Sequence, residues 1–113
     1  MFKTLLRTKT YETVSPKEAK KRLEENPNLL LLDVRTPEEY REIHIPGSKL
    51  IPLNELEQGI KRAVPDKNRE ILVYCLSGAR AAAACSRLSA MGYTRVGNMG
   101  GIRSWPYQTV NGR

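Results

Sequence analysis

Two runs of apolar residues mark the centre of the predicted fold. Residues 29–34 (LLLLDV) and 71–75 (ILVYC) carry almost no polar side chains and are bounded by turn residues. Continuous apolar runs of this length are typical of parallel strands that are covered on both faces. Shorter segments at residues 50–52 and 95–98 predict two further strands.

The segments between these strands have the polar caps of helices. The sequences SPKE (15–18) and TPEE (36–39) both have the spacing of a capping box, with proline at the first helical position. An alanine run with high helix propensity follows the second long strand, and a glycine suited to a C-terminal cap ends it. Helices are therefore predicted over residues 16–25, 37–42 and 54–64, and from the run at 81–84 to Gly92.

Regular alternation of strands and helices indicates the fold class. It predicts an α/β protein with a central, mainly parallel sheet and helices on both faces. The chain has 113 residues, which fits a single domain. We expect this domain to span residues 10–113, after an N-terminal arm or short edge strand at residues 1–9.

Composition and charge narrow the range of partners. Hydrophobic content of 40% and charged content of 27% are those of an ordinary soluble globular protein. The net charge of +7 reflects either a solvated surface or the attraction of anions, whether a small substrate or an acidic partner. Nucleic acid is the weaker candidate, because the basic residues are dispersed and only one Phe and one Trp could stack on bases.

Cysteine usage and hydropathy indicate the compartment. Two cysteines cannot form a disulfide framework, and no Cys/His cluster has the spacing of zinc ligands, so neither a metal nor another cofactor is expected. Charges interrupt residues 1–7 before an apolar core of signal-peptide length develops, and no apolar run could span a membrane. These features predict a cytoplasmic protein without membrane association.

The strongest chemical signal is a cysteine at the predicted carboxyl end of a central strand. This is the edge at which open parallel sheets bind ligands. The small-residue loop after Cys75 also opens a helix, so its N–H groups and the helix dipole would converge on the thiol and favour the thiolate. A buried core cysteine is the alternative, but this loop argues against it. We predict an anion-binding site with Cys75 as nucleophile, followed by Leu76, Ser77, Gly78, Ala79 and Arg80.

Four segments of the chain are read together: LDVRTPEEY (32–40), HIPGS (44–48), CLSGAR (75–80) and GGIRSW (100–105). They resemble the signatures of a known family, the single-domain rhodaneses, which are thiosulfate- or persulfide-handling sulfurtransferases. The resemblance covers residues 12–107 in the family's order and spacing. One departure is Ile43, where the family usually has a glycine before the histidine.

The resemblance implies a two-step sulfur transfer. The Cys75 thiolate would take the outer sulfur of an anionic donor such as thiosulfate and hold it as a persulfide. Cyanide or a thiol would then remove the sulfur, and the acceptor could be a thioredoxin-like or sulfur-carrier protein. The amides of residues 76–80 would stabilise the anionic sulfur, and Arg80 would neutralise the charge of the donor.

Two other functions remain open. Cysteine phosphatases have five residues between cysteine and arginine, whereas only four separate Cys75 from Arg80. A phosphatase, or an arsenate reductase with its longer loop, is therefore a less favoured function than sulfur transfer. A rhodanese fold without turnover, acting as a binding or regulatory module, is a rival that the intact cysteine and arginine argue against.

Five further residues could carry chemistry but are expected to have structural roles. Asp33 and Arg35 follow a central strand and should bond to neighbouring loops, although they could shape the pocket. His44 lies in a turn, and Trp105 is expected to pack in the core or at the rim. Cys85 lies ten residues beyond the first cysteine on the core side of a helix, and is expected to be buried and inert.

Overall fold

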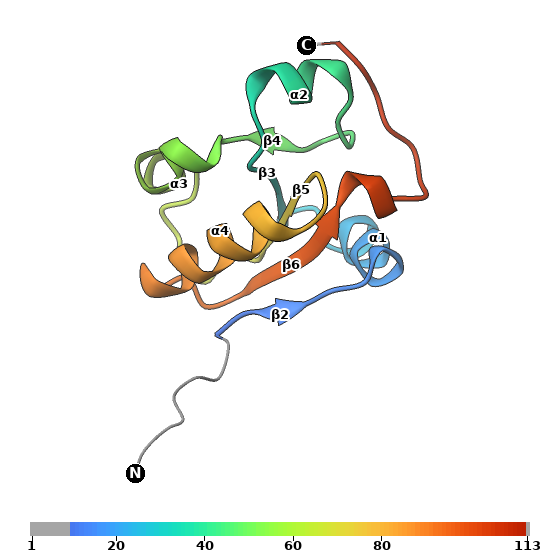
Figure 1. Ribbon diagram of the computed structural model, residues 1–113. Helices are drawn as coiled ribbons and strands as arrows, with labels where there is room; N and C mark the ends of the chain where they lie inside the picture. The colour runs from blue at the N-terminus through green and yellow to red at the C-terminus, as the bar shows by residue number, and fades with distance from the viewer. Residues whose placement is uncertain (1–9, 113) are drawn as a thin grey trace.

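The computed structural model describes residues 10–112, and its centre is a five-stranded sheet in the order β2-β6-β5-β3-β4. Every pair of neighbouring strands is parallel, which confirms the predicted α/β fold (Figure 1). The arm or edge strand predicted at residues 1–9 lies outside the described residues. The strands are β2 Glu12–Thr13, β3 Leu30–Asp33, β4 Lys49–Leu50, β5 Ile71–Cys75 and β6 Val96–Gly101.

All of the predicted helices form. Thr36 and Glu39 make the complete capping box at the start of α2. At α1, the Ser15 hydroxyl accepts a hydrogen bond from the Glu18 N–H at 3.1 Å, while the Glu18 carboxylate accepts one from Arg22 Nε at 2.9 Å. The helices are α1 Pro16–Glu25, α2 Pro37–Glu42, α3 Leu56–Ala63 and α4 Ala79–Ala90, with short 3₁₀ turns η1 Leu53–Glu55 and η2 Ile102–Ser104.

Helices cover both faces of the sheet. Alternate side chains of a strand point to opposite faces, so Leu30 and Leu32 of β3 pack with α3 and α4, whereas Leu31 packs with α1 and η2. Both sets are buried, which is why β3 and β5 are continuous apolar runs. None of the helices in residues 10–112 has the length and apolar character needed to cross a bilayer.

The structure corrects the predicted strands at three places. β2 was not predicted, since its two residues are exposed and show no alternation. β4 is Lys49–Leu50, so it begins one residue before the expected strand at residues 50–52 and ends two residues earlier. β6 runs three residues past the expected end at Asn98, through a bulge that pairs Val73 with Asn98 but Cys75 with Gly101. The bulge places one extra residue on β6 at the carboxyl end of the cysteine strand.

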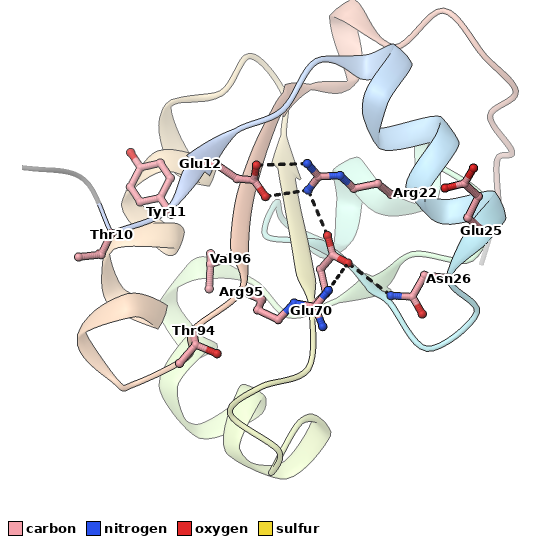
Figure 2. Close-up of a pocket in the computed structure, with 10 residues that line it drawn as sticks. All are labelled: Thr10, Tyr11, Glu12, Arg22, Glu25, Asn26, Glu70, Thr94, Arg95 and Val96. Atoms are coloured by element: carbon pink, nitrogen blue, oxygen red, sulfur yellow. Dashed lines mark hydrogen bonds and ion pairs between the residues drawn. The ribbon is translucent and has the colours of Figure 1, made fainter.

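A cleft with a volume of about 700 Å³ lies at the opposite, amino-terminal edge of the sheet (Figure 2). Four of the five charged side chains that line it are paired with one another. Arg22 of α1 contacts Glu12 at 2.7 Å and Glu70 at 3.1 Å, and Glu70 also contacts Arg95 and Asn26 at 3.3 Å each. These contacts join α1 to the starts of β2, β5 and β6, so we assign this edge a structural role.

Candidate active site

Cys75 is the last residue of β5, and its thiol lies under the loop that leads into α4. The Sγ atom accepts hydrogen bonds from the N–H of Gly78 at 3.0 Å and from the N–H of Ala81 at 3.3 Å. Only 1% of the residue is exposed. Two backbone N–H donors, one from the loop and one from the first turn of α4, therefore converge on the sulfur.

Gly78 gives this loop its shape. It has φ +115°, in the left-handed region that favours glycine, and it is the N-cap residue of α4. Its N–H points to Cys75 Sγ, while its carbonyl oxygen accepts the first helical hydrogen bond from the Ala82 N–H at 2.9 Å. The N–H groups of Ala79 and Arg80 have no acceptor within residues 10–112, so the first turn of α4 has donors to offer an anion.

The end of β6 supports the other side of the loop. The Leu76 carbonyl oxygen accepts a hydrogen bond from the Arg103 N–H at 3.2 Å. A Cβ atom on Gly101 would lie 2.0 Å from that same oxygen, which no side chain could tolerate. A glycine at position 101 is therefore needed so that the backbones of β6 and the cysteine loop can touch.

Arg80 points toward α2 and pairs with Glu39. Its two terminal nitrogens donate to the two carboxylate oxygens at 2.8 and 3.0 Å. This hydrogen bonding lowers the pKa of Glu39 to about 2, and it also raises the pKa of Arg80. The charge expected beside the thiol is therefore present but already paired, and one face of the guanidinium is fixed toward α2.

A small cavity lies beside Arg80. It measures about 360 Å³, and Arg87 and the η1 segment form its other walls, together with Val34, Arg35, Thr36 and Pro52. Of the cysteine loop, Arg80 alone is among the residues that line this cavity.

Cys85 lies in the core, as predicted. It is fully buried in the cluster between α4 and the sheet, among residues such as Ala84 and Leu88. Burial raises the pKa of its thiol to about 12, and the nearby Cys75 adds to the effect. A thiol in this state is a small apolar side chain rather than a nucleophile.

Asp33 and Arg35 form a buried ion pair and bond to a neighbouring loop, as expected, while Arg35 also lines the cavity beside Arg80. The Arg35 Nη2 atom lies 2.8 Å from Asp33 Oδ2 and donates a second hydrogen bond to the Ile43 carbonyl oxygen at 2.6 Å. Together they anchor the turn after α2 to the end of β3. Both are almost completely buried.

His44 and Trp105 are both buried and contact nearby backbone groups. The His44 ring stacks on Tyr40 with centroids 3.7 Å apart, and its Nδ1 lies 2.8 Å from the Tyr40 carbonyl oxygen. Its backbone pairs with Val110. Trp105 packs in the core on the α1 face and donates from Nε1 to the Gln108 carbonyl oxygen at 3.1 Å.

Three contributors to the site were missed in the sequence. The N–H of Ala81 lies one residue beyond the predicted set of amides. Its hydrogen bond to Cys75 Sγ is seen only in the structure. Glu39 was interpreted only as a capping residue, although a carboxylate in a signature segment was an available signal. The support from Gly101 could have been inferred from the glycine doublet. Within residues 10–112 no cluster of His, Cys, Asp and Glu could hold a metal.

Comparison with known proteins places the chain in one family. Residues 15–107 match the rhodanese-like domain. The chain is 44% identical over 81 residues to the thiosulfate sulfurtransferase PspE of Escherichia coli K12, covering 72% of this chain and 78% of that one. It is 39% identical over 85 residues to a sulfurtransferase of Allochromatium vinosum, covering 74% and 78%.

A solved structure agrees with these sequence matches. A rhodanese with anions from E. coli superimposes with a TM-score of 0.67 at 40% identity, over 74% of this chain and 99% of that one. The chain therefore belongs to the rhodanese-like family and is a rhodanese-type sulfurtransferase. The resemblance inferred from the four sequence segments is confirmed.

Proposed function

We propose that the protein transfers sulfane sulfur through a persulfide on Cys75. The observation that carries this proposal is the pair of N–H groups, from Gly78 and Ala81, that donate to Cys75 Sγ at the carboxyl end of β5. A sulfur anion held by two backbone donors is the nucleophile that this transfer needs. The same donors can stabilise the terminal sulfur of a persulfide, which also carries a negative charge.

With thiosulfate as donor, the first step is a displacement at sulfur. The Cys75 thiolate attacks the outer sulfur and a new S–S bond forms. The S–S bond of thiosulfate breaks, and its electron pair leaves with sulfite. The persulfide keeps the single negative charge that the thiolate carried, so the step is balanced without a cofactor.

The second step returns the free enzyme. Cyanide or a thiolate attacks the terminal sulfur of the persulfide, the enzyme's S–S bond breaks, and Cys75 leaves as a thiolate. The products are thiocyanate or a new persulfide on the acceptor. The small size of the loop is consistent with a single sulfur atom as the group held.

The loop and Arg80 are proposed to bind the anionic donor. The N–H groups of Ala79 and Arg80 are oriented by the first turn of α4, and residues 76–80 form the cradle. Arg80 shares two of its five N–H donors with Glu39, which leaves others for an oxyanion. Arg80 would therefore orient the anionic donor as well as neutralise its charge.

The acceptor is proposed to be a small nucleophile or a protein thiol, such as that of a thioredoxin-like or sulfur-carrier protein. Residues 10–113 are proposed to be the unit that carries the activity. Both cysteines are unpaired, which supports the cytoplasm or another reducing compartment as the site of the reaction.

One observation favours a second candidate, a binding module without turnover. Cys75 is only 1% exposed and Arg80 is already paired, so a donor must enter a nearly closed loop. A loop that never admitted a donor would still serve as part of a folded docking domain.

Mass spectrometry of the intact protein separates these candidates. After incubation with thiosulfate and removal of excess donor, we expect one added sulfur atom on Cys75, released on addition of cyanide with formation of thiocyanate. The Cys85→Ala variant should load equally, because that thiol is buried. Absence of the added sulfur in protein that is folded and reduced would favour the binding module.

A further inference from the structure

The side chain of Asn98 connects the bulge of β6 to the cysteine loop. Its Oδ1 atom accepts a hydrogen bond from the Gly100 N–H at 2.8 Å, and its Nδ2 atom donates a longer one to the Gly78 carbonyl oxygen at 3.4 Å. The two contacts fix the orientation of the carboxamide. An N–H can only donate, so the oxygen must face Gly100 and the nitrogen must face Gly78.

Asn98 is therefore bonded to the residue that shapes the site. Gly78 donates its own N–H to Cys75 Sγ at 3.0 Å and has φ +115°. Its carbonyl oxygen receives both the Ala82 N–H, at 2.9 Å, and the Asn98 carboxamide. Rotation of Gly78 away from this conformation would break both contacts and turn its N–H away from the thiol.

The bulge brings the end of β6 close to the cysteine loop. Gly100 has φ +89° and lies close to Gly78, since a Cβ on Gly78 would be 3.6 Å from the Gly100 Cα. The hydrogen bond from Gly100 to Asn98 spans two residues, as in an Asx turn, and holds the bulge against the loop. The backbone of Asn98 is also fixed, because its carbonyl oxygen accepts from the Val14 N–H at 2.8 Å.

We propose that Asn98 is a positioning residue for Cys75, holding Gly78 in the conformation that stabilises the sulfur anion. It does not touch the reacting sulfur and acts through the loop. The inference rests on the proposed function only for its catalytic consequence. Stabilisation of the thiolate can be measured without any sulfur transfer.

Asn26 offers a matched control at the other edge of the sheet. It is also half-buried, its Oδ1 accepts from the Asn28 N–H at 3.1 Å, and its Nδ2 donates to Glu70 at 3.3 Å. At both positions the substitution removes one hydrogen bond from a backbone N–H and one bond donated by the carboxamide, to a carbonyl at Asn98 and to a carboxylate at Asn26. Only one of the two asparagines is connected to the cysteine loop.

The test measures the rate of iodoacetamide labelling of Cys75 across pH in a Cys85→Ala background. Asn98→Ala should shift the half-maximal labelling rate to higher pH and slow labelling below that midpoint by about three- to tenfold, the worth of one hydrogen bond. Asn26→Ala should label like the parent. Urea denaturation and circular dichroism report whether each variant is folded under the labelling conditions.

A second substitution separates the bulge from the loop. Asn98→Ser retains a hydroxyl that can accept from Gly100 but is too short to reach Gly78. It should be close to the parent in stability and still shift the labelling profile. If Asn98→Ala does not fold, the labelling profile of Asn98→Ser alone tests the proposal.

The outcomes distinguish this proposal from the proposed function. A folded Asn98→Ser protein that labels like the parent overturns the positioning role. A shifted labelling profile in a protein whose parent forms no persulfide would retain the positioning role and refute the sulfur transfer. If the Asn26 and Asn98 variants shift the profile equally, the effect is general loss of stability and the positioning role is refuted.

Discussion

The two edges of the sheet use polar groups in opposite ways. At the amino-terminal edge, a cleft of about 700 Å³ is lined mostly by charged side chains that pair with one another, with Glu70 bonded to three partners (Figure 2). At the carboxyl-terminal edge, the space is small, and backbone N–H groups of the cysteine loop converge on one sulfur. The comparison shows that a small site with oriented backbone donors can offer an anion more than a larger cleft whose charges are already paired.

The sharpest test of this comparison is removal of the sulfur itself. Cys75→Ser should reduce thiosulfate-dependent thiocyanate formation to background, because a hydroxyl at neutral pH is neither ionised nor able to form a persulfide. Cys85→Ala should retain most of the activity. Initial rates with both purified proteins check this, and equal losses in the two variants would contradict the assignment of Cys85 as inert.

The contact between Gly101 and the loop should be the next most sensitive feature. A methyl group on Gly101 would lie 2.0 Å from the Leu76 carbonyl oxygen, so Gly101→Ala must displace the loop. A displacement of about 1 Å can cost about a hundredfold in rate, and we expect a loss of kcat of that order.

Gly97 on the same strand is the matched control. A methyl group there would meet the Leu72 side chain at 2.8 Å and the Val14 side chain at 3.0 Å, without touching the loop. Gly97→Ala should cost about 1–3 kcal/mol of stability, as overpacking does, while kcat per folded molecule is retained. Stability by urea denaturation and kcat by steady-state assay should therefore separate the two glycines.

A smaller effect is expected from Arg80, because Glu39 already engages two of its donors. Arg80→Ala should raise the KM for thiosulfate by about 10- to 100-fold, since a charge-assisted hydrogen bond is worth about 1.5–3 kcal/mol. Arg80→Lys should recover only part of this loss, because a point charge replaces a planar fork. Arg95→Ala, at the other edge, should leave KM unchanged, and an equal rise there would indicate only a long-range effect of charge.

The smallest effect on activity should come from Glu70. Glu70→Gln weakens the contacts to Arg22 and Arg95 at the amino-terminal edge, and should lower the free energy of unfolding by about 1–2 kcal/mol. Thiocyanate formation per folded molecule should not change. A fall in kcat without a fall in stability would show that this edge communicates with Cys75.

The sequence predicted the parts of the fold that depend on local patterns. Strands β3 and β5 were visible because every residue in them is buried, and α2 because its capping box is complete within four residues. β2 was not visible, because a pair of exposed residues has no pattern of its own and becomes a strand only by pairing with β6.

The site, like the fold, was predictable where it depends on residues close together in the sequence. Cys75 and the loop after it were identified from their order along the chain. The pairing of Arg80 with Glu39 joins residues 41 positions apart, and the contact of Asn98 with Gly78 joins residues 20 apart. Neither has a local signal, because only the parallel crossovers bring these segments to the same edge. The end of β6 was missed for a related reason, since a segment with three glycines among six residues looks like a turn.

The order of β5 and β6 in the sequence has a consequence for biosynthesis. The cysteine loop contacts Asn98, Gly101 and Arg103, which a ribosome adds more than twenty residues after Cys75. A nascent chain that ends before these residues carries the thiol but lacks the segment that contacts the loop. The surroundings of Cys75 are therefore completed only after β6 has been synthesised.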